Sequence, residues 1–487
     1  MHRLDLEGVG RMDVRKRTLL GLGLCGTVVM FSLCITVGAQ EPATSEVRDA
    51  MRRAAGYYVT QVASHGGYVY HYSEDLRSRW GEGAATGDQI WVQPPGTPTV
   101  GLAWVRAFEA TGDEFYLDAA KQAAQALIYG QLKSGGWTNC IDFDPQGDRV
   151  AEYRVGRGRG KNHSSLDDGQ TQTALRFLMQ LDRACEFSNQ GVHETVQLGL
   201  KALLAAQFEN GAFPQVWTGP VSGHPPRKAS FPDYDWKNEH RVKDYWNLPT
   251  LNDNVAGYVA ETLIDAYKIY EDDRYLQALN RLARFLCDAQ CPPPQPGWAQ
   301  QYNAQMHPAW ARKFEPPALA SDETQEAIAT LLKIYQLTRD PEVLKPIPPA
   351  LEWLRQSLLP EGQLARYYEL QSNRPLYMKR QGELYTLTYD DDQLPSHYSW
   401  KIASKIAQLQ RAYDRARNSV PEPRHRVSAR KVREILESLD EQGRWVLEYG
   451  GEKLVGQPKF QRGDRYLSSQ LFSRHLTTLA DYLNDRS

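Results

Sequence analysis

A repeated pair of helices, separated by loops rich in glycine and proline, is the feature that most constrains the fold of this chain. Apolar residues recur at helical spacing in many segments, for example 174–185 and 255–267. Repetition at a long, nearly constant period predicts helix hairpins packed side by side. The expected starts of the first helix of each pair are Thr97, Ser165, Thr250, Asp322, Pro395 and Ser468.

Hairpins of this kind close into a ring when several follow one another. We therefore predict an all-α fold, an α/α toroid, in which a barrel of helix hairpins surrounds an open central cleft and long loops crowd one rim. No convincing set of alternating strands is found. The loops share a pattern, because an aromatic residue is followed by glutamine at the same place in 213–215 and 298–300. Glycine as a helix C-cap explains the glycines of these loops but not this pair of residues.

Length and composition fit one large domain, which we place at residues 40–487. With 24% charged residues and a mean hydropathy of −0.57, the chain is neither a multi-span membrane protein nor disordered. A net charge of −2 leaves no basic surplus for general nucleic-acid binding. Aromatic residues make up 10% of the chain, which suits sugar rings and a thick helical core equally. We expect a monomer.

The first 39 residues have the pattern of a secretory signal peptide. Arg15-Lys16-Arg17 precedes an apolar run at 19–37, and small residues end at Ala39. We expect cleavage after Ala39 and a secreted or periplasmic protein with no membrane contact afterwards. A retained signal anchor is the alternative, because a run of about 19 apolar residues just spans a bilayer.

Carboxylates stand where two of the predicted inner helices begin. Leu166-Asp167-Asp168-Gly169 precedes one helix and Leu251-Asn252-Asp253-Asn254 precedes the next. Taken singly, each motif is explained by N-capping of a helix. Two acidic caps on neighbouring inner helices would, however, converge on one rim. Oxygen ligands from several loops are how proteins hold Ca²⁺, so the pattern indicates a cation site, although neither stretch is an EF-hand loop.

Arginines cluster in the later loops of the chain. Arg312 follows the third loop, and Arg366, Arg374 and Arg380 follow the fourth. Guanidinium groups bind carboxylates bidentately, and local basic rims on a slightly acidic protein indicate an anionic ligand held locally. Solvated loop charge remains the better interpretation for Arg374.

Five segments together resemble the pectate lyases of polysaccharide lyase family 10, the pectic acid lyase family. They are LDDGQT at 166–171, GAFPQVW at 211–217, LNDN at 251–254, WAQQY with ARKFEP within 298–316, and RYYELQSNRP at 366–375. The similarity runs from about residue 46 to about residue 450, and the order and number of the motifs are fairly specific. The resemblance implies an α/α toroid, secretion, and Ca²⁺-dependent β-elimination of polygalacturonate.

The same resemblance implies roles for individual residues. Asp167 and Asp253 would contact Ca²⁺ and the substrate carboxylate, and Arg312 would be the Brønsted base. Arg366 and Arg380 would clamp uronate carboxylates. Further substrate contacts are expected from Asp168, Asn254, Trp298 and Tyr367.

Three departures from the family pattern bear on these roles. Asp168 stands where the family usually has asparagine, and the loop at 136–139 lacks Pro-Gln. A charged, aromatic insert at about 219–245 separates the second loop from its aspartate. An insert at this place can cover the cleft and change the number of subsites or the choice of substrate.

The chemistry of uronate elimination needs such a set of residues. Removing the C5 proton builds negative charge next to a carboxylate, and Ca²⁺ neutralises that charge as a Lewis acid. Arg366 or Arg380 would stabilise the charge further. Arginine is an awkward base because its free pKa exceeds about 12, and only a packed cationic site beside Ca²⁺ would lower it usefully.

Two rival functions stay open. An α/α-toroid glycoside hydrolase acting on uronic-acid-containing glycans would use Asp167 or Asp168 with Asp253 as its carboxyl pair, without Ca²⁺. A non-catalytic glycan-binding relative would leave the polysaccharide intact. The fold does not choose among these functions, but the aspartates together with the arginines favour the lyase.

Overall fold

The computed structural model describes residues 41–486, except 156–157, 239–242 and 424–425. The predicted signal peptide at 1–39 lies outside the described residues. Residues 42–487 form one compact unit. Among the helices of the described part of the chain, none has the length and apolar character needed to cross a membrane.

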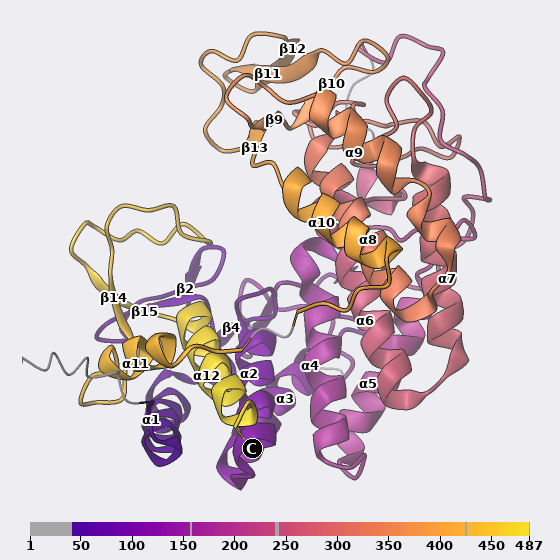
Figure 1. Ribbon diagram of the computed structural model, residues 1–487. Helices are drawn as coiled ribbons and strands as arrows, with labels where there is room; N and C mark the ends of the chain where they lie inside the picture. Colours follow the sequence, from indigo (N-terminus) through magenta and orange to yellow (C-terminus); the bar gives the residue numbers. More distant parts are fainter. Residues whose placement is uncertain (1–40, 156–157, 239–242, 424–425, 487) are drawn as a thin grey trace, which may run out of the picture. The chain divides into compact units, whose positions relative to one another are not determined.

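The helices alternate between an inner and an outer layer (Figure 1). The inner helices pack on one another in the order α12, α2, α4, α6, α8 and α10. Their bounds are Ser469–Asn484, Thr97–Thr111, Gln170–Ala184, Val255–Tyr270, Ser321–Thr338 and Ile406–Arg417. This arrangement confirms the predicted helix-hairpin fold of the α/α-toroid class.

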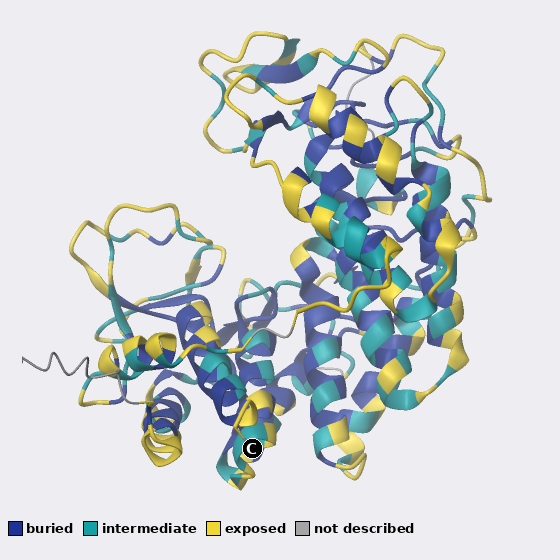
Figure 2. Cartoon of the chain, in the orientation of Figure 1, coloured by how far each residue is buried: buried dark blue, intermediate teal, exposed yellow. Residues whose placement is uncertain are grey.

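Each of four inner helices packs against the outer helix that follows it in the chain. These outer helices are α3 (Glu114–Gly130), α5 (Gln190–Ala205), α7 (Asp273–Ala289) and α9 (Ile347–Gln356). Two more helices, α1 (Thr44–Tyr57) and α11 (Ala429–Glu437), pack against α12. Apolar side chains recurring at helical spacing on α7, such as Leu279, Leu282 and Leu286, are fully buried between the layers. Figure 2 shows the buried faces turned toward neighbouring helices.

A short turn with a common structure joins the two helices of three hairpins. A residue in the left-handed conformation ends the inner helix, and an aspartate caps the helical segment that follows. In the first hairpin these are Gly112, with φ 68°, and Asp113, whose carboxylate accepts from Phe115 N at 3.0 Å. Left-handed residues satisfy helix ends and aspartate satisfies helix starts, so the turn is fixed by local chemistry.

The predicted starts of the inner helices are largely confirmed. Helix α2 begins at Thr97 as predicted, and α8 and α12 begin within one residue of the expected position. Before α4 and α6 lie the 3₁₀ turns η2 (Asp167–Gly169) and η4 (Asn252–Asn254), so these helices start at Gln170 and Val255. The start at Pro395 is wrong, because α10 begins eleven residues later, after the strand β13 (Lys401–Ile402).

Short strands connect the rim loops, and the expectation of no strands is wrong. A four-stranded antiparallel sheet has the order β12 (Leu384–Thr388), β11 (Pro375–Gln381), β10 (Tyr367–Tyr368) and β8 (Leu319–Ala320). A five-stranded antiparallel sheet has the order β14 (Val446–Glu448), β15 (Arg465–Ser468), β1 (His71–Ser73), β2 (Arg79–Trp80) and β3 (Ala84–Ala85). Strands of two or three residues are too short to carry an alternating pattern, which is why the sequence concealed them.

Three further strand pairs tie neighbouring rim loops together. They are β4 (Gln89–Trp91) with β5 (Cys140–Asp142), β6 (Ser164–Ser165) with β7 (Val216–Trp217), and β9 (Leu364–Ala365) with β13. The remaining short helical turns are η1 (Tyr58–Val62), η3 (Tyr245–Asn247) and η5 (Pro341–Leu344). Each pair links loops that are far apart in sequence and so fixes the rim.

Candidate functional site

The rim is built from one hydrogen bond that recurs in four successive hairpins. A backbone N–H just before an inner helix donates to the carbonyl of the residue that lies four positions beyond a loop position. The four bonds are Val92 N to Asn139 O, Leu166 N to Gln215 O, Leu251 N to Gln300 O and Ser321 N to Arg366 O, with lengths of 2.8, 2.8, 2.8 and 2.9 Å. Residues at matching places in this register are therefore structurally equivalent.

This equivalence groups the polar residues of the rim into two series. The residues that follow the four donors are Gln93, Asp167, Asn252 and Asp322. The next residues along are Pro94, Asp168, Asp253 and Glu323. The equivalent of Asp253 is thus Asp168, and a third acidic cap, which the sequence did not single out, begins α8.

The structure brings the two predicted metal-site aspartates together. Gln215 Nε2 donates to Asp167 Oδ1 at 2.5 Å and to Asp253 Oδ2 at 3.3 Å. The side-chain amide of Asn252 donates to the same oxygen of Asp253. Two carboxylates from neighbouring hairpins therefore share one amide group at the start of α4 and α6.

The backbone of both caps is left-handed at two consecutive residues. In the first cap these are Asp168 (φ 45°) and Gly169 (φ 75°), and in the second Asp253 (φ 52°) and Asn254 (φ 55°). Aspartate, asparagine and glycine are the residues that tolerate this region best. Backbone held in sparsely populated conformations is typical of functional sites, and here it turns each carboxylate toward the rim.

Like charges dominate the electrostatics of these caps. The pKa of Asp253 is raised well above its usual value, first by burial and then by its hydrogen bond with Asp167 and the charges of Asp167 and Asp168. The pKa of Asp168 is raised to about 6 by burial, by Asp167 and by Glu82. Carboxylates held this close need a proton or a cation between them.

The donor set fits a hard divalent cation such as Ca²⁺. Asp167 and Asp253 supply carboxylate oxygens from adjacent loops, and the buried Asn252 Oδ1 has no hydrogen-bond partner in the described part of the chain. Oxygen ligands of this kind are those that Ca²⁺ takes in proteins. In their present hydrogen bonds, the amide N–H groups of Gln215 and Asn252 offset the negative charge that a cation would neutralise.

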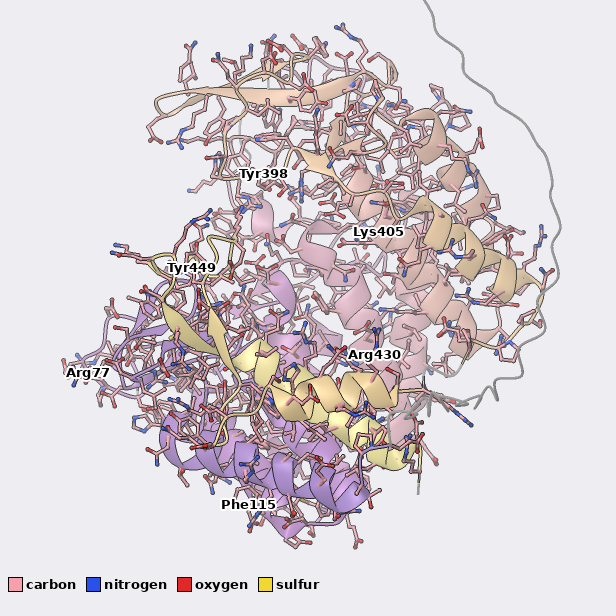
Figure 3. The ribbon with its side chains drawn as sticks, turned by 60° about the vertical axis from the view of Figure 1, so that its left-hand side comes forward. Arg77, Phe115, Tyr398, Lys405, Arg430 and Tyr449 are labelled. Carbon is pink, nitrogen blue, oxygen red and sulfur yellow. The ribbon has the colours of Figure 1, made fainter. Side chains whose placement is uncertain are left out.

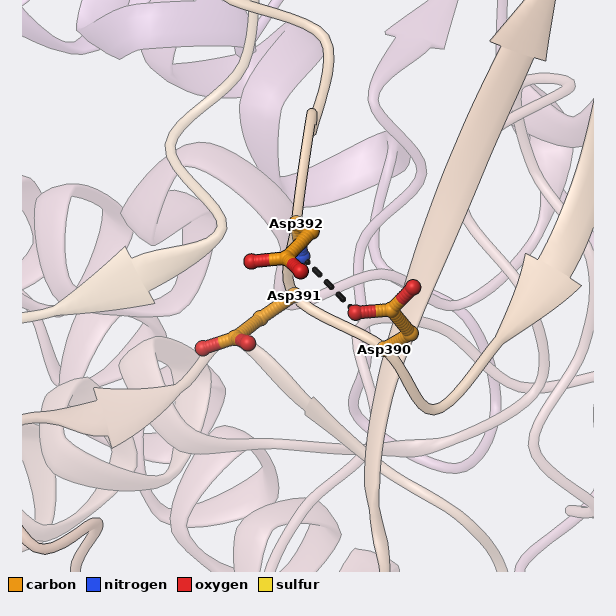
Figure 4. A group of neighbouring side chains, drawn as sticks. All are labelled: Asp390, Asp391 and Asp392. Atoms are coloured by element: carbon orange, nitrogen blue, oxygen red, sulfur yellow. Dashed lines mark hydrogen bonds between the residues drawn. The ribbon is translucent and has the colours of Figure 1, made fainter.

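Another acidic group lies elsewhere on the rim. Within residues 41–486, apart from the three undescribed gaps, only Asp390, Asp391 and Asp392 place three carboxylate, thiol or imidazole ligands within 4.8 Å of one another (Figure 4). All three are exposed, and Lys379 and Lys401 pair with two of them at 2.5 and 2.7 Å. The lysines already neutralise this group, so we do not assign it a metal.

Arg312 lies in a turn closed by Glu315. Glu315 Oε2 accepts from Arg312 N at 2.9 Å, its other carboxylate oxygen accepts from the guanidinium, and the side chain of Arg312 is 38% exposed. Burial lowers the pKa of Arg312, but Glu315, Tyr398 and Asp253 together raise it above its ordinary value. The lowered pKa that a base requires is therefore not found in this arrangement.

Arg312 and the acidic caps belong to one electrostatic environment. The charge of Asp253 acts on Arg312, and the charge of Arg312 lowers the pKa of both Asp168 and Asp253 against the effect of burial. Asp167 joins them through its hydrogen bond with Gln215 and Asp253. The three predicted catalytic residues thus open onto a common site.

Arg366 occupies the place in its hairpin that Gln215 and Gln300 occupy in theirs. Its guanidinium lies 3.8 Å from Asp322 and 3.7 Å from Glu323, and its side chain is 12% exposed. These distances are long for ion pairs, and its buried Nε has no partner among the described residues. Arg366 therefore keeps donor capacity for a ligand.

Two of the predicted substrate contacts are wrong. Trp298 is fully buried and its indole N–H donates to Leu286 O at 2.8 Å, so it anchors the third loop to α7. Tyr367 is also fully buried, with its hydroxyl donating to Gln300 Oε1 at 2.5 Å. An aromatic residue in a rim loop resembles a sugar platform in sequence, but here both rings serve the core.

The other predicted substrate contacts lie nearer to solvent. Asp168 accepts from Gln93 Nε2 at 2.9 Å, and Asn254 lies over the first turn of α6, beside Gly257. Arg380 on β11 is 43% exposed, pairs with Glu383 at 3.3 Å and lies over the ring of Tyr385. Their roles in binding remain predictions.

The insert at 219–245 runs beside the site. Trp310 Nε1 donates to Trp236 O at 2.9 Å, two residues before Arg312, and the ammonium of Lys237 pairs with Glu369. At its far end, Gln215 N donates to Trp246 O at 2.9 Å. The insert therefore contacts both the loop that carries Arg312 and the loop that carries Gln215.

Several residues of the site were not predicted. Gln215 and Gln300 had a signal, since the shared aromatic-then-glutamine pattern of two loops marks them. Glu315 stands in the motif that contains Arg312, yet no role followed from it. Tyr398 had no signal, because it reaches the site from a loop far along the chain.

Comparison with known proteins places part of the chain in context. The model of the family described as pectic acid lyase matches residues 131–364. Two solved structures of a family 10 polysaccharide lyase from Cellvibrio cellulosa are similar, each with a TM-score of 0.45: one is 20% identical over 60% of this chain and 91% of that chain, and the other, a mutant in complex with trigalacturonic acid, is 19% identical over 67% and 99%. A cellobiose 2-epimerase from Bacillus thermoamylovorans is 12% identical over 91% and 99%, with a TM-score of 0.46. No curated protein sequence matches the chain.

The family match confirms the predicted resemblance and the predicted class of enzyme, a polysaccharide lyase. Asp167, Asp253 and Arg312 lie inside the matched segment, whereas Arg366 and Arg380 lie beyond its end. The structural likenesses, with TM-scores below 0.5, carry no further weight.

Proposed function

We propose, from the match of residues 131–364 to the pectic acid lyases, that this chain is a secreted or periplasmic pectate lyase that cleaves polygalacturonate by Ca²⁺-assisted β-elimination. The observation that carries the proposal is the meeting of Asp167 and Asp253 through Gln215, within the electrostatic reach of Arg312. The complex of a structurally similar lyase with trigalacturonic acid agrees with this substrate class.

The residues divide the work of the elimination. A bound Ca²⁺ would supply Lewis-acid neutralisation of the uronate carboxylate beside the C5 proton. Asp167 and Asp253, with Asn252 Oδ1, are the residues that would hold it. Arg366, with unused donor capacity, binds a carboxylate of the substrate and stabilises the charge that grows as the C5–H bond breaks.

Arg312 is placed to take the C5 proton only in its neutral form. The pairing with Glu315 keeps its guanidinium protonated in the ligand-free site. Neutralisation of Asp253 by a cation would remove one of the charges that raise the pKa of Arg312. We therefore expect the reaction rate to rise with pH across the alkaline range.

The proposal is tested on polygalacturonate with Ca²⁺, with and without a chelator, by the ultraviolet absorbance of the unsaturated product. A lyase produces absorbance that the chelator abolishes and that added Ca²⁺ restores. Cleavage with new saturated reducing ends and no absorbance would instead identify a glycoside hydrolase, for which the raised pKa of Asp168 is the favouring observation, since it suits a general acid. Binding without any change in chain length would identify a non-catalytic glycan-binding protein.

A further inference from the structure

Tyr398 lies against both arginines of the site. The guanidinium carbon of Arg366 is 4.5 Å from the centroid of its ring, and that of Arg312 is 5.8 Å away. Tyr398 belongs to the loop between β12 and β13, which lies beyond the segment matched by the family model, and it is labelled in Figure 3. An aromatic ring attracts cations through its electron-rich face, so one ring here serves two guanidinium groups.

The hydroxyl of Tyr398 joins the network that holds Arg312. It donates to Glu315 Oε1 at 2.9 Å, the carboxylate that grips the main chain and the guanidinium of Arg312. It also lies 3.1 Å from the hydroxyl of Tyr367, which donates to Gln300. Ring and hydroxyl thus connect four rim loops to one point.

Both arginines keep an unused donor beside this ring. Arg312 Nε and Arg366 Nε are buried without a hydrogen-bond partner in the described part of the chain. Buried donors of charged groups are costly to leave unsatisfied, so a ligand that supplies acceptors stabilises this arrangement. A uronate carboxylate has the charge and the planar pair of oxygens for it.

We propose that Tyr398 is a positioning residue, which sets the separation of Arg312 and Arg366 so that both guanidinium groups face the same uronate unit. This inference rests on the proposed lyase function. The ring keeps the two cations on either side of a fixed spacer, and the hydroxyl keeps Glu315 where it directs Arg312. Without the ring, each guanidinium loses a fixed neighbour, and Glu315 alone must orient Arg312.

The test compares two variants with a matched control. Tyr398→Phe removes only the hydroxyl, and we expect kcat on polygalacturonate to fall about tenfold, the loss typical of one hydrogen bond to a charged group, with KM little changed. Tyr398→Leu also removes the ring beside Arg366, and we expect a larger fall in kcat together with a higher KM. Tyr335→Phe is the control, because Tyr335 on α8 also lies under an arginine, Arg339 at 5.6 Å, but lines no part of this site.

Two further measurements separate positioning from folding. The melting temperatures of the three variants should agree with one another within a few degrees, and the pH dependence of kcat should move in Tyr398→Phe but not in Tyr335→Phe. The double variant Tyr398→Phe with Glu315→Gln should lose less than the sum of the two single losses, because both act on Arg312 through one bond.

Defined outcomes overturn the inference. Wild-type kcat, KM and pH profile in both Tyr398 variants would remove Tyr398 from the site, and so would losses that track a fall in melting temperature. Binding of trigalacturonate, measured by calorimetry with Ca²⁺ present, gives a readout besides turnover and should weaken in Tyr398→Leu. If the wild-type protein forms no unsaturated product, the proposed function fails; if it does and Tyr398 proves indifferent, only this inference fails.

Discussion

At the scale of single residues, the site depends on charges of the same sign held together and on amides that separate them. Asp167 and Asp253 share the amide of Gln215, and Arg312 is held by the carboxylate of Glu315. Each of these groups lies in a pair or triplet whose balance a ligand changes. Substitutions here should therefore affect ligand binding and turnover more than folding.

Replacing Arg312 tests the base. In Arg312→Ala we expect turnover of polygalacturonate to be abolished while trigalacturonate binding survives, because Arg366 and the aspartates still contact the carboxylates. Absorbance of the product and calorimetry measure the two effects. Arg430→Ala, on the exposed face of α11, is the control, with its side chain 88% exposed. Retained kcat in Arg312→Ala would assign proton abstraction to another group.

Replacing Gln215 tests the amide that bridges the two carboxylates. Gln215→Leu keeps the side chain's bulk but removes the group that orients Asp167 and Asp253, so we expect about a 10–100-fold higher Ca²⁺ concentration at half-maximal activity. Titration of activity with Ca²⁺ measures it, with Gln408→Leu on the exposed face of α10 as the control. An unchanged titration would show that Gln215 does not organise a metal site.

At the scale of elements, the rim loops hold the site because each is anchored to a neighbouring helix. The indole N–H groups of Trp137 and Trp298 both donate at 2.8 Å to a carbonyl near the end of the preceding outer helix, Leu127 O and Leu286 O. Gly211 approaches the backbone of α7 so closely that a Cβ there would lie 2.1 Å from Arg281 O. Loop position and helix packing are thus coupled.

This coupling gives a prediction for Gly211. In Gly211→Ala the left-handed φ of 93° and the collision with Arg281 O should lower the free energy of unfolding by at least about 1–2 kcal/mol. The shift of the loop that carries Gln215 should lower activity in the surviving folded protein. Denaturant titration and the absorbance assay measure both effects. Gly219→Ala, which has nothing within 4 Å, should match the wild type; equal stability of the two variants would contradict the collision.

Apolar periodicity was enough to predict the hairpins and their inner helices, because a helix that buries one face repeats that face along its sequence. The acidic caps were found for a similar reason, since each is a local motif next to a helix start. The strands β11 and β12, the buried role of Trp298 and the place of Tyr398 were not found. Each depends on a partner distant in sequence, such as Leu286 for Trp298 or Glu315 for Tyr398, and local pattern carries no information about such partners.

At the scale of the whole molecule, buried acids make stability depend on pH. Burial and neighbouring carboxylates raise the pKa of Glu326 to about 8 and that of Glu323 to about 7, although Arg366 opposes the second shift. In the unfolded chain these groups titrate near 4.5, so the folded state binds more protons between about pH 4.5 and 8. Their contribution to stability is therefore greatest at acid pH and declines as the pH rises through this window.

Glu326→Gln should remove part of this decline. A neutral amide at this position carries no ionisation penalty, so we expect the free energy of unfolding at pH 8 to increase by about 1–3 kcal/mol relative to the wild type, with little difference at pH 5. Denaturant titration at the two pH values measures it. Glu437→Gln, at an exposed position at the end of α11, serves as the control. A gain of equal size at both pH values would mean that the effect is not due to ionisation.

The recurring backbone bond of the rim makes the polysaccharide groove modular. Since Asn139, Gln215, Gln300 and Arg366 are presented by equivalent bonds in four hairpins, an exchange at one of these positions leaves the framework of the other three in place. The series changes from neutral amides to a cation along the chain, and a polymer lying across it meets a different partner at each unit. Such a groove distinguishes the two ends of the polymer, and its preference can be rewritten one hairpin at a time.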